Sequence, residues 1–308
     1  MTEEAPSWFL EAIGTKPETG SVRVDGATIV YRAWGRPGCR AVVLVHGGSA
    51  HAGWWDHIAP QLADGRQVVA IDLSGHGDSD RRDTYDIDTW AREVLAVAAA
   101  VGQDTAVRTG ATVSVDAATL LVGHSMGGAV SLRAAALDPS QVFGVIAVDS
   151  VMRELSADER AARERRALGP PRRYTTREIA IGHFKPMPEQ REPMLPYVLS
   201  HVAAASVREC DGAWTWKFDP RIMLRRPLTP PEVPRLECRI ALLRAQYSRF
   251  SAKTADDLNE RLGRRVPSIE LPQAGHHILF DQPLVLVAAL RTLMASWEDV
   301  ATLTGPRV

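Results

Sequence analysis

The stretch that decides the fold is LLVGHSMGGAV, residues 120–130. It begins with a short apolar run of the kind that forms buried parallel strands. Ser125 follows in the pattern G-x-S-x-G, and the residues from Met126 to Leu137 predict a helix that ends before Pro139. A serine on a sharp strand-to-helix turn projects its hydroxyl above the sheet, and flanking glycines let strand and helix approach closely. The stretch therefore predicts a nucleophilic serine, although a glycine-rich turn with a capping serine would give the same short pattern.

Strand-like and helix-like segments alternate on both sides of this stretch. The predicted strands are a hairpin within 21–34 that turns at Asp25-Gly26, then 41–46, 67–72, 118–124, 142–149, 238–245 and 266–272. The predicted helices are 54–63, 89–101, the one after Ser125, 252–263 and 283–297, while 102–117 is expected to be a surface loop. Such alternation predicts an α/β protein whose doubly wound sheet is mainly parallel and covered by helices on both faces.

The alternation stops between residues 151 and 236, where helical and proline-rich sequence takes over. Capping boxes at Ser156/Glu159 and Thr175/Glu178 each predict a helix start, and a third helix is expected within 193–209. The proline-rich stretch 225–236 predicts a semi-rigid return to the sheet. We therefore expect residues 1–150 and 237–308 to form one α/β core, with 151–236 as a helical insertion.

Composition indicates an ordinary globular protein and argues against several classes of partner. The 308 residues are 45% hydrophobic and 24% charged, with a net charge of −1, so neither nucleic acid nor an anionic membrane surface is expected to bind. No apolar run approaches the roughly 20 residues of a membrane span, and the first residues lack the pattern of a secretory signal. Cys39, Cys210 and Cys238 are odd in number and widely spaced. We expect a cytoplasmic protein without metal or cofactor, its oligomeric state left open, a homodimer included.

Polar residues gather at the ends of the predicted strands, in the order His46-Gly47-Gly48, Asp72, Ser125, Asp149 and Gly275-His276. In doubly wound sheets, ligands bind at the carboxyl ends of the strands. A nucleophilic serine needs a nearby base, an acid that orients the base, and N–H donors for the oxyanion. These strand ends supply all of them, in the chain order serine, acid, histidine.

Over nearly its whole length the chain resembles the α/β-hydrolase family. The resemblance rests on HGG at 46–48, DLSGHGDS at 72–79, GHSMGG at 123–128 and AGHHILFDQP at 274–283. It implies an α/β-hydrolase fold with Ser125 as the nucleophile and the backbone N–H groups of Gly48 and Met126 as the oxyanion hole. It further implies that residues 151–236 are a helical cap over the site.

Two adjacent histidines compete for the role of base. His276 is favoured over His277, because it directly follows a glycine and has the family's spacing to Asp281 and Pro283. His277 is then expected to pack in the core or to line the pocket. His46, His124, Asp72 and His76 are expected to be structural.

The acid departs from the family's commonest pattern. Many relatives carry the orienting aspartate just beyond the seventh strand, but the matching stretch here is RAQYSRF, 244–250, with Arg249 at that place. Arginine cannot accept a hydrogen bond from an imidazole N–H. Asp149 is our choice, because some branches, including haloalkane dehalogenases and a group of lactonases, carry their acid after the sixth strand. Asp256, Asp257 and a dyad without an acid remain alternatives.

These observations predict a serine hydrolase that acts on a small, largely apolar carboxylic ester or lactone through an acyl-enzyme on Ser125. Carbon–carbon bond hydrolysis and cofactor-free lyase chemistry use the same triad and stay open, as does a non-catalytic small-molecule binder. Aromatic and histidine side chains expected to contact substrate are Trp54, His183, Tyr197, Trp214 and Trp216. The simpler alternative is that these rings pack the insertion onto the core.

Overall fold

The computed structural model describes residues 4–37, 40–109, 118–150, 152–233, 235–248, 251–263 and 266–303. Cys39, Arg249 and residues 110–117 of the expected loop lie outside these ranges, as does residue 151, where the insertion was expected to begin. Cys210 and Cys238 are free thiols. None of the helices in the described ranges is long and apolar enough to cross a membrane.

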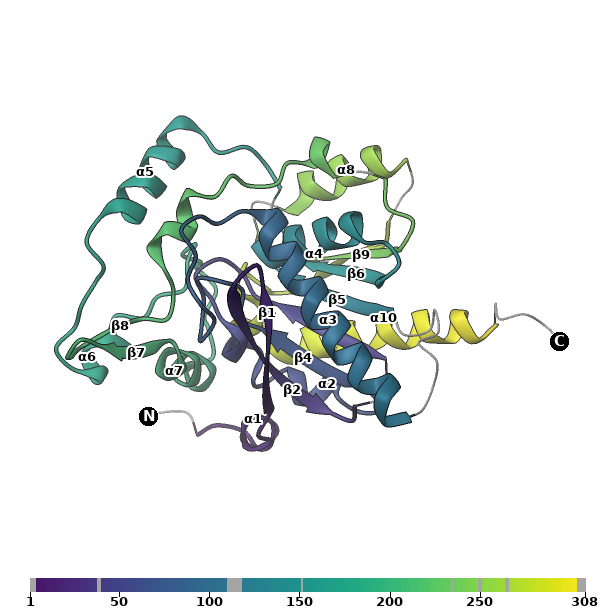
Figure 1. Cartoon of the computed structure of the whole chain (residues 1–308), viewed down its shortest axis with the longest axis horizontal. Coiled ribbons are helices and arrows are strands. Elements are labelled where there is room, and N and C mark those ends of the chain that lie inside the picture. The colour runs from purple at the N-terminus through teal and green to yellow at the C-terminus, as the bar shows by residue number, and fades with distance from the viewer. Residues whose placement is uncertain are drawn as a thin grey trace.

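One eight-stranded sheet runs through the molecule in the order β1-β2-β4-β3-β5-β6-β9-β10 (Figure 1). β1 and β2 form an antiparallel hairpin, and β2 is antiparallel to β4. The other strands of this sheet, β4, β3, β5, β6, β9 and β10, run parallel to one another. The mainly parallel α/β-hydrolase fold is therefore confirmed. The strands are β1 Glu18–Val24, β2 Ala27–Gly35, β3 Ala41–Val45, β4 Gln67–Ile71, β5 Thr119–His124, β6 Val142–Val148, β9 Arg239–Ala245 and β10 Ser268–Leu271.

The central strands are apolar on both faces because each face supports its own core. In β3, Val43 and Val45 pack into one core, which helices α3 (Ile87–Thr109), α4 (Met126–Leu137) and α8 (Ser251–Leu262) complete. Val42 and Leu44 of the same strand face the other core, with α1 (Ser7–Gly14), α2 (Ala59–Leu62) and α10 (Pro283–Leu303). Burial on both faces explains why these strands read as continuous apolar runs.

Two helix predictions were wrong in their extent. The expected helix 54–63 is a 3-10 turn, Ala52–Trp55, followed by the short helix α2. Pro60 has no N–H for a continuous helix, and it lies instead in the first turn of α2, where none is needed. The helix predicted to end at Val101 continues as α3 to Thr109, into the sequence expected to be a loop.

The segment between β6 and β9 lies to one side of the sheet, at the left of Figure 1. The elements of this inserted segment (152–233) are α5 Ala157–Leu168, α6 Arg177–Gly182, α7 Pro196–Ala205, β7 Val207–Cys210, β8 Ala213–Trp216 and two 3-10 turns, η3 Pro220–Leu224 and η4 Pro230–Glu232. Backbone hydrogen bonds attach the segment to the core, including Gly77 N–H to Lys217 O and Leu195 N–H to Phe280 O.

The structure tests the capping boxes of this segment one by one. The box Ser156/Glu159 is present at the start of α5. Helix α6 is capped by Thr176, whose hydroxyl accepts from Ile179 N–H, so the predicted cap at Thr175 was wrong by one residue. The hairpin β7–β8 was not predicted, although Asp211-Gly212 is a turn signal and both residues have positive φ.

Candidate active site

Ser125 stands on the sharp turn between β5 and α4. Its backbone is strained, with φ 54° and ψ −119°, a conformation that side chains rarely adopt. Across the turn, a Cβ on Gly123 would lie 2.2 Å from Gly127 O. A Cβ on Gly127 would lie 2.2 Å from Val45 O, at the end of the neighbouring strand β3. Only glycine fits at these two positions, which is the physical reason for the G-x-S-x-G pattern.

The side chains of His276 and Asp149 complete a chain of hydrogen bonds from Ser125. His276 follows β10, and its Nε2 lies 3.1 Å from Ser125 Oγ. Its Nδ1 lies 2.7 Å from Oδ2 of Asp149, which directly follows β6. With the ring proton on Nδ1, His276 donates to Asp149 and accepts from the serine hydroxyl. The structure thus brings together three residues that are far apart in the sequence and that the sequence analysis had grouped.

Asp149 is fully buried, and its carboxylate is held by the backbone N–H of Ala245 as well as by the histidine. Its φ of 42° is unusual for an aspartate, and its Oδ1 accepts the N–H of Ala245 at 3.1 Å. Burial raises the pKa of Asp149, but the hydrogen bond and the charge of His276 and the N–H of Ala245 outweigh burial. The pKa of this carboxyl group therefore lies below its ordinary value, so Asp149 is an anion at neutral pH.

The loop that carries His276 is fixed on both sides. His124 Nε2 lies 2.9 Å from the His276 carbonyl oxygen, and Asp281 Oδ2 accepts the N–H of Gly275 at 2.7 Å. His277 points elsewhere, with its Nε2 2.8 Å from Pro188 O. Burial and then the nearby His276 lower the pKa of His277 to about 3, so this ring is neutral.

Among the described residues, neither alternative acid is hydrogen-bonded to the histidine. Asp256 and Asp257 belong to α8, and the Nδ1 of His276 is already engaged by Asp149. Asp72 has a structural role, since its oxygens accept the N–H groups of Ala52 at 2.6 Å and Asp78 at 2.9 Å. Burial raises the pKa of Asp72 to about 6.

The turn after β3 borders the serine on its other side. A Cβ on Gly47 would lie 3.3 Å from Ser125 Cβ, and a Cβ on Gly48 would lie 3.8 Å from the sulfur of Met126. Within the described part of the chain, the N–H groups of Gly48 and Met126 donate to no protein atom. Two unused N–H donors beside a serine hydroxyl are what an oxyanion hole requires.

Ser125 opens into a cavity of about 410 Å³ that the core and the inserted segment line together. Trp54 lines this cavity beside His124 and His277. The other four residues expected to contact substrate do not line it. Instead, Trp214 pairs with Tyr174 through backbone hydrogen bonds, Trp216 packs on Tyr174 and Phe184, His183 on Tyr174, and Tyr197 on Trp8 and Phe9.

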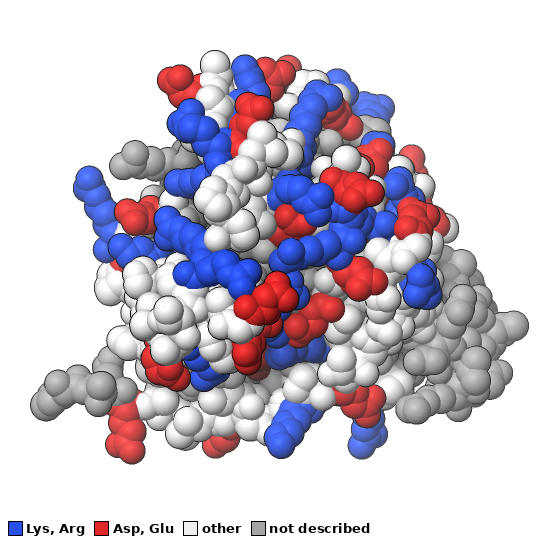
Figure 2. Space-filling model, turned by 60° about the vertical axis from the view of Figure 1, so that its left-hand side comes forward, with Lys and Arg blue, Asp and Glu red and all other residues white. Residues whose placement is uncertain are grey.

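Charged residues of the inserted segment line the same cavity and were missed by the sequence analysis. They are Arg153, Glu159, Arg163, Arg166 and Arg225. Their signal in the sequence was a charged helix and a pair of arginines, and such runs usually face solvent. Figure 2, which brings this side of the molecule forward, shows Lys and Arg side chains interspersed with Asp and Glu. Among the described residues, no three His, Cys, Asp or Glu side chains are grouped as a metal site would require.

A mainly parallel sheet that carries a serine on a strand-to-helix turn, with histidine and aspartate at neighbouring strand ends, defines a hydrolase. The chain belongs to the Alpha/beta hydrolase family, whose sequence pattern matches residues 42–290.

Several known proteins are similar to this chain. The chain is 25% identical to esterase Rv0045c of Mycobacterium tuberculosis, with 88% of each chain covered. It is 33% identical to a dihydrolipoyllysine-residue acetyltransferase component of the acetoin cleaving system of Pseudomonas putida, over 46% of this chain and 34% of that protein. The match to that second relative thus spans only about a third of its length. Among solved structures, the thioesterase domain from the curacin biosynthetic pathway superimposes with a TM-score of 0.68 at 21% identity, covering 89% of this chain and 99% of that one. That likeness supports the fold.

Proposed function

We propose that the protein hydrolyses a carboxylic ester, open or cyclic as in a lactone, through an acyl-enzyme on Ser125. The observation that carries the proposal is the continuous hydrogen-bonded path from Ser125 Oγ through His276 to the buried Asp149. Similarity to an esterase over most of both chains supports an ester as the substrate.

In the first half of the reaction, His276 Nε2 takes the hydroxyl proton while Ser125 Oγ forms a bond to the substrate carbonyl carbon. The N–H groups of Gly48 and Met126 stabilise the negative charge that develops on the carbonyl oxygen. Asp149 stabilises the imidazolium, which then gives its proton to the leaving alkoxide as the carbon–oxygen bond breaks.

In the second half, water replaces the alcohol. His276 takes a proton from water, and the resulting hydroxide attacks the acyl-enzyme carbonyl. The tetrahedral intermediate collapses, Ser125 recovers its proton from His276, and the carboxylic acid leaves.

We propose in addition that the inserted segment is the cap of this hydrolase, between core parts 1–150 and 237–308. Support comes from the cavity beside Ser125, whose walls include Arg153, Met187 and Arg225 of this segment. A cavity wall formed by the inserted segment would select substrates, while the catalytic side chains belong to the α/β core. A cytoplasmic location remains a prediction.

The test is turnover of a panel of 4-nitrophenyl esters and lactones by the wild-type protein and by Ser125→Ala. The matched control is Ser131→Ala, which removes a buried hydroxyl from the adjoining helix α4. We expect Ser125→Ala to lose all activity with its melting temperature preserved, and Ser131→Ala to remain active. Retention of more than about a hundredth of the activity by Ser125→Ala would contradict the nucleophile assignment.

A further inference from the structure

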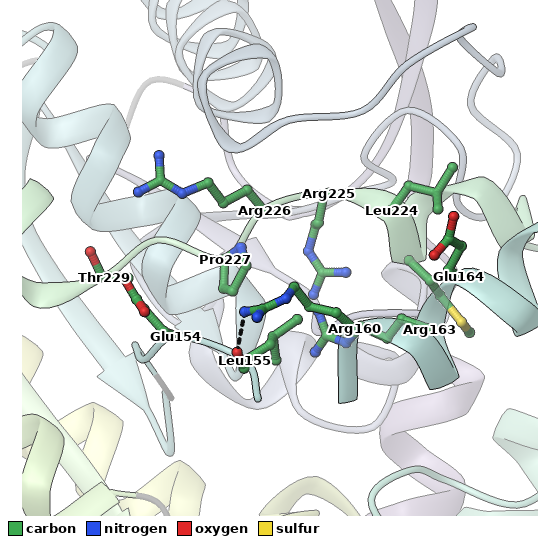
Figure 3. Close-up of a pocket in the computed structure, with 11 residues that line it drawn as sticks. Glu154, Leu155, Arg160, Arg163, Glu164, Leu224, Arg225, Arg226, Pro227 and Thr229 are labelled. Atoms are coloured by element: carbon green, nitrogen blue, oxygen red, sulfur yellow. Dashed lines mark hydrogen bonds between the residues drawn. The ribbon is translucent and has the colours of Figure 1, made fainter. Parts of the chain in front are cut away.

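Arg163 and Arg225 both line the wall of the Ser125 cavity, and neither forms a salt bridge to a carboxylate among the described residues. Arg163 comes from α5 and Arg225 from the chain just after η3. Both residues line the cavity that holds Ser125 and also a second cavity of about 410 Å³. Figure 3 shows their side chains extending toward each other from opposite walls, so the pair stands where the two cavities meet.

Arg225 lies beside the proposed oxyanion hole. Its Nη2 is 3.4 Å from the position that a Cβ would take on Gly48. Its Nη1 donates to Ile222 O at 3.1 Å, and its guanidinium lies over the ring of Trp90 at 5.5 Å. Its buried Nε has no hydrogen-bond partner among the described residues. Burial, and then the charge of Arg163, lower the pKa of Arg225 to about 9.

Arg163 also has an N–H donor without a partner among the described residues, whereas Arg153 and Arg226 form ion pairs. Its buried Nη1 has no partner in the part of the chain that the structure describes. By contrast, Arg153 pairs with Glu159, whose carboxylate also accepts the backbone N–H of Ser156 in the capping box. Burial lowers the pKa of Arg163 and the negative charge of Glu159 acts to raise it, but among the described residues Glu159 forms no salt bridge to Arg163. Arg226, the residue after Arg225, pairs with Glu232 at 2.7 Å, and Figure 3 shows it extending away from Arg225.

Two half-buried cations side by side are unfavourable unless an anion joins them, because each has lost part of its hydration. The protein as a whole does not supply a general attraction for anions, since its net charge is −1 and both signs mix on this face (Figure 2). Any preference of the cavity for an anionic ligand must therefore come from Arg163 and Arg225 themselves. A carboxylate, planar and with two acceptor oxygens, matches the donor geometry of a guanidinium.

We propose that the substrate carries a carboxylate, which Arg163 and Arg225 bind within the same cavity as Ser125. This inference rests on the proposed function and narrows its substrate class from esters in general to esters of dicarboxylic acids or other carboxylate-bearing acyl groups. Because Arg225 borders Gly48, the carboxylate would lie a few bonds from the reacting carbonyl.

The kinetic test compares two esters that differ in one terminal group, mono-(4-nitrophenyl) glutarate and 4-nitrophenyl valerate. We expect the wild type to favour the glutarate ester, and Arg225→Met to lower the ratio of the two kcat/KM values about 10- to 100-fold. Arg163→Met should lower the same ratio, and it serves in place of Arg225→Met if that variant does not fold. Arg226→Met, which removes the same charge one residue away, should leave the ratio unchanged. An unchanged ratio in both Arg225→Met and Arg163→Met would overturn the inference.

A binding measurement separates this inference from the proposed function. We expect glutarate to bind Ser125→Ala in calorimetry, where no turnover occurs, and to lose at least about tenfold in affinity when Arg225→Met is added. If glutarate binds in this way but the wild-type protein hydrolyses no ester, the proposed function is refuted and the carboxylate-binding site is supported. Ester hydrolysis with no glutarate binding would refute the anion site alone. Inorganic phosphate that binds as tightly as glutarate would contradict the carboxylate assignment.

Discussion

Replacing Asp149 with asparagine isolates the contribution of its charge, because the two side chains have nearly the same shape. Asp149 is completely buried, and its Oδ2 lies 2.7 Å from His276 Nδ1. During attack His276 becomes an imidazolium, and a carboxylate at about 4 Å from its charge centre stabilises it by about 4 kcal/mol at an effective dielectric constant near 20. Since each 1.36 kcal/mol is about tenfold in rate, kcat should fall about 1,000-fold.

The fold should survive this substitution, because the amide oxygen of asparagine can still accept the N–H of Ala245. The assay is steady-state hydrolysis of a 4-nitrophenyl ester, with melting temperature and near-UV circular dichroism to verify folding. Asp256→Asn, which removes an exposed carboxylate from α8, is the control and should keep full activity. A folded Asp149→Asn protein with more than about a tenth of the wild-type kcat would refute the role of Asp149.

Three further predictions concern the turn, the pH dependence and the cavity. Gly123→Ala should abolish folding or activity, because its Cβ would lie 2.2 Å from a backbone oxygen, whereas Gly102→Ala in α3 meets nothing within 4 Å and should melt at or above the wild-type temperature. Burial lowers the pKa of His57 to about 4 from 6.5, so the unfolded chain takes up the proton at a higher pH than the folded protein does, and the free energy of unfolding falls as pH drops from about 6.5 to 4. In urea titrations, His57→Phe should reduce the slope of unfolding free energy against pH by up to about 1.36 kcal/mol per pH unit. An unchanged slope would show that His57 does not contribute. Trp54→Ala should alter relative rates on bulky and small esters, whereas Trp214→Ala should lower only the melting temperature; equal selectivity in the two variants would mean that Trp54 is a packing residue.

The parts of the fold set by local sequence could be predicted. β3, β4, β5 and β6 are continuous apolar runs because helices cover both faces of the sheet, and apolar runs are visible in a sequence. Ser125 could be found for a related reason, since the steric demands of its turn require glycines at fixed spacing. Asp149 and His276 could be grouped with it because parallel strands end at one edge.

The residues that depend on tertiary packing could not be found in this way. Arg163 and Arg225 read as surface charges, and only the placement of α5 beside η3 directs them into the cavity. The aromatic residues Trp214 and Trp216 read as pocket residues, but hairpin pairing and ring packing occupy them. Side-chain type alone does not say whether a ring packs against protein or against a ligand.

The central claim is that Ser125 is a nucleophile activated by His276, and covalent trapping tests it most directly. The measurement is the intact mass and the modified peptide after treatment with a fluorophosphonate, in the wild type, Ser125→Ala and His276→Ala. We predict one adduct per chain on Ser125, none in Ser125→Ala, and labelling at least about 100-fold slower in His276→Ala. An unmodified wild type, or an adduct that persists in Ser125→Ala, would contradict the account.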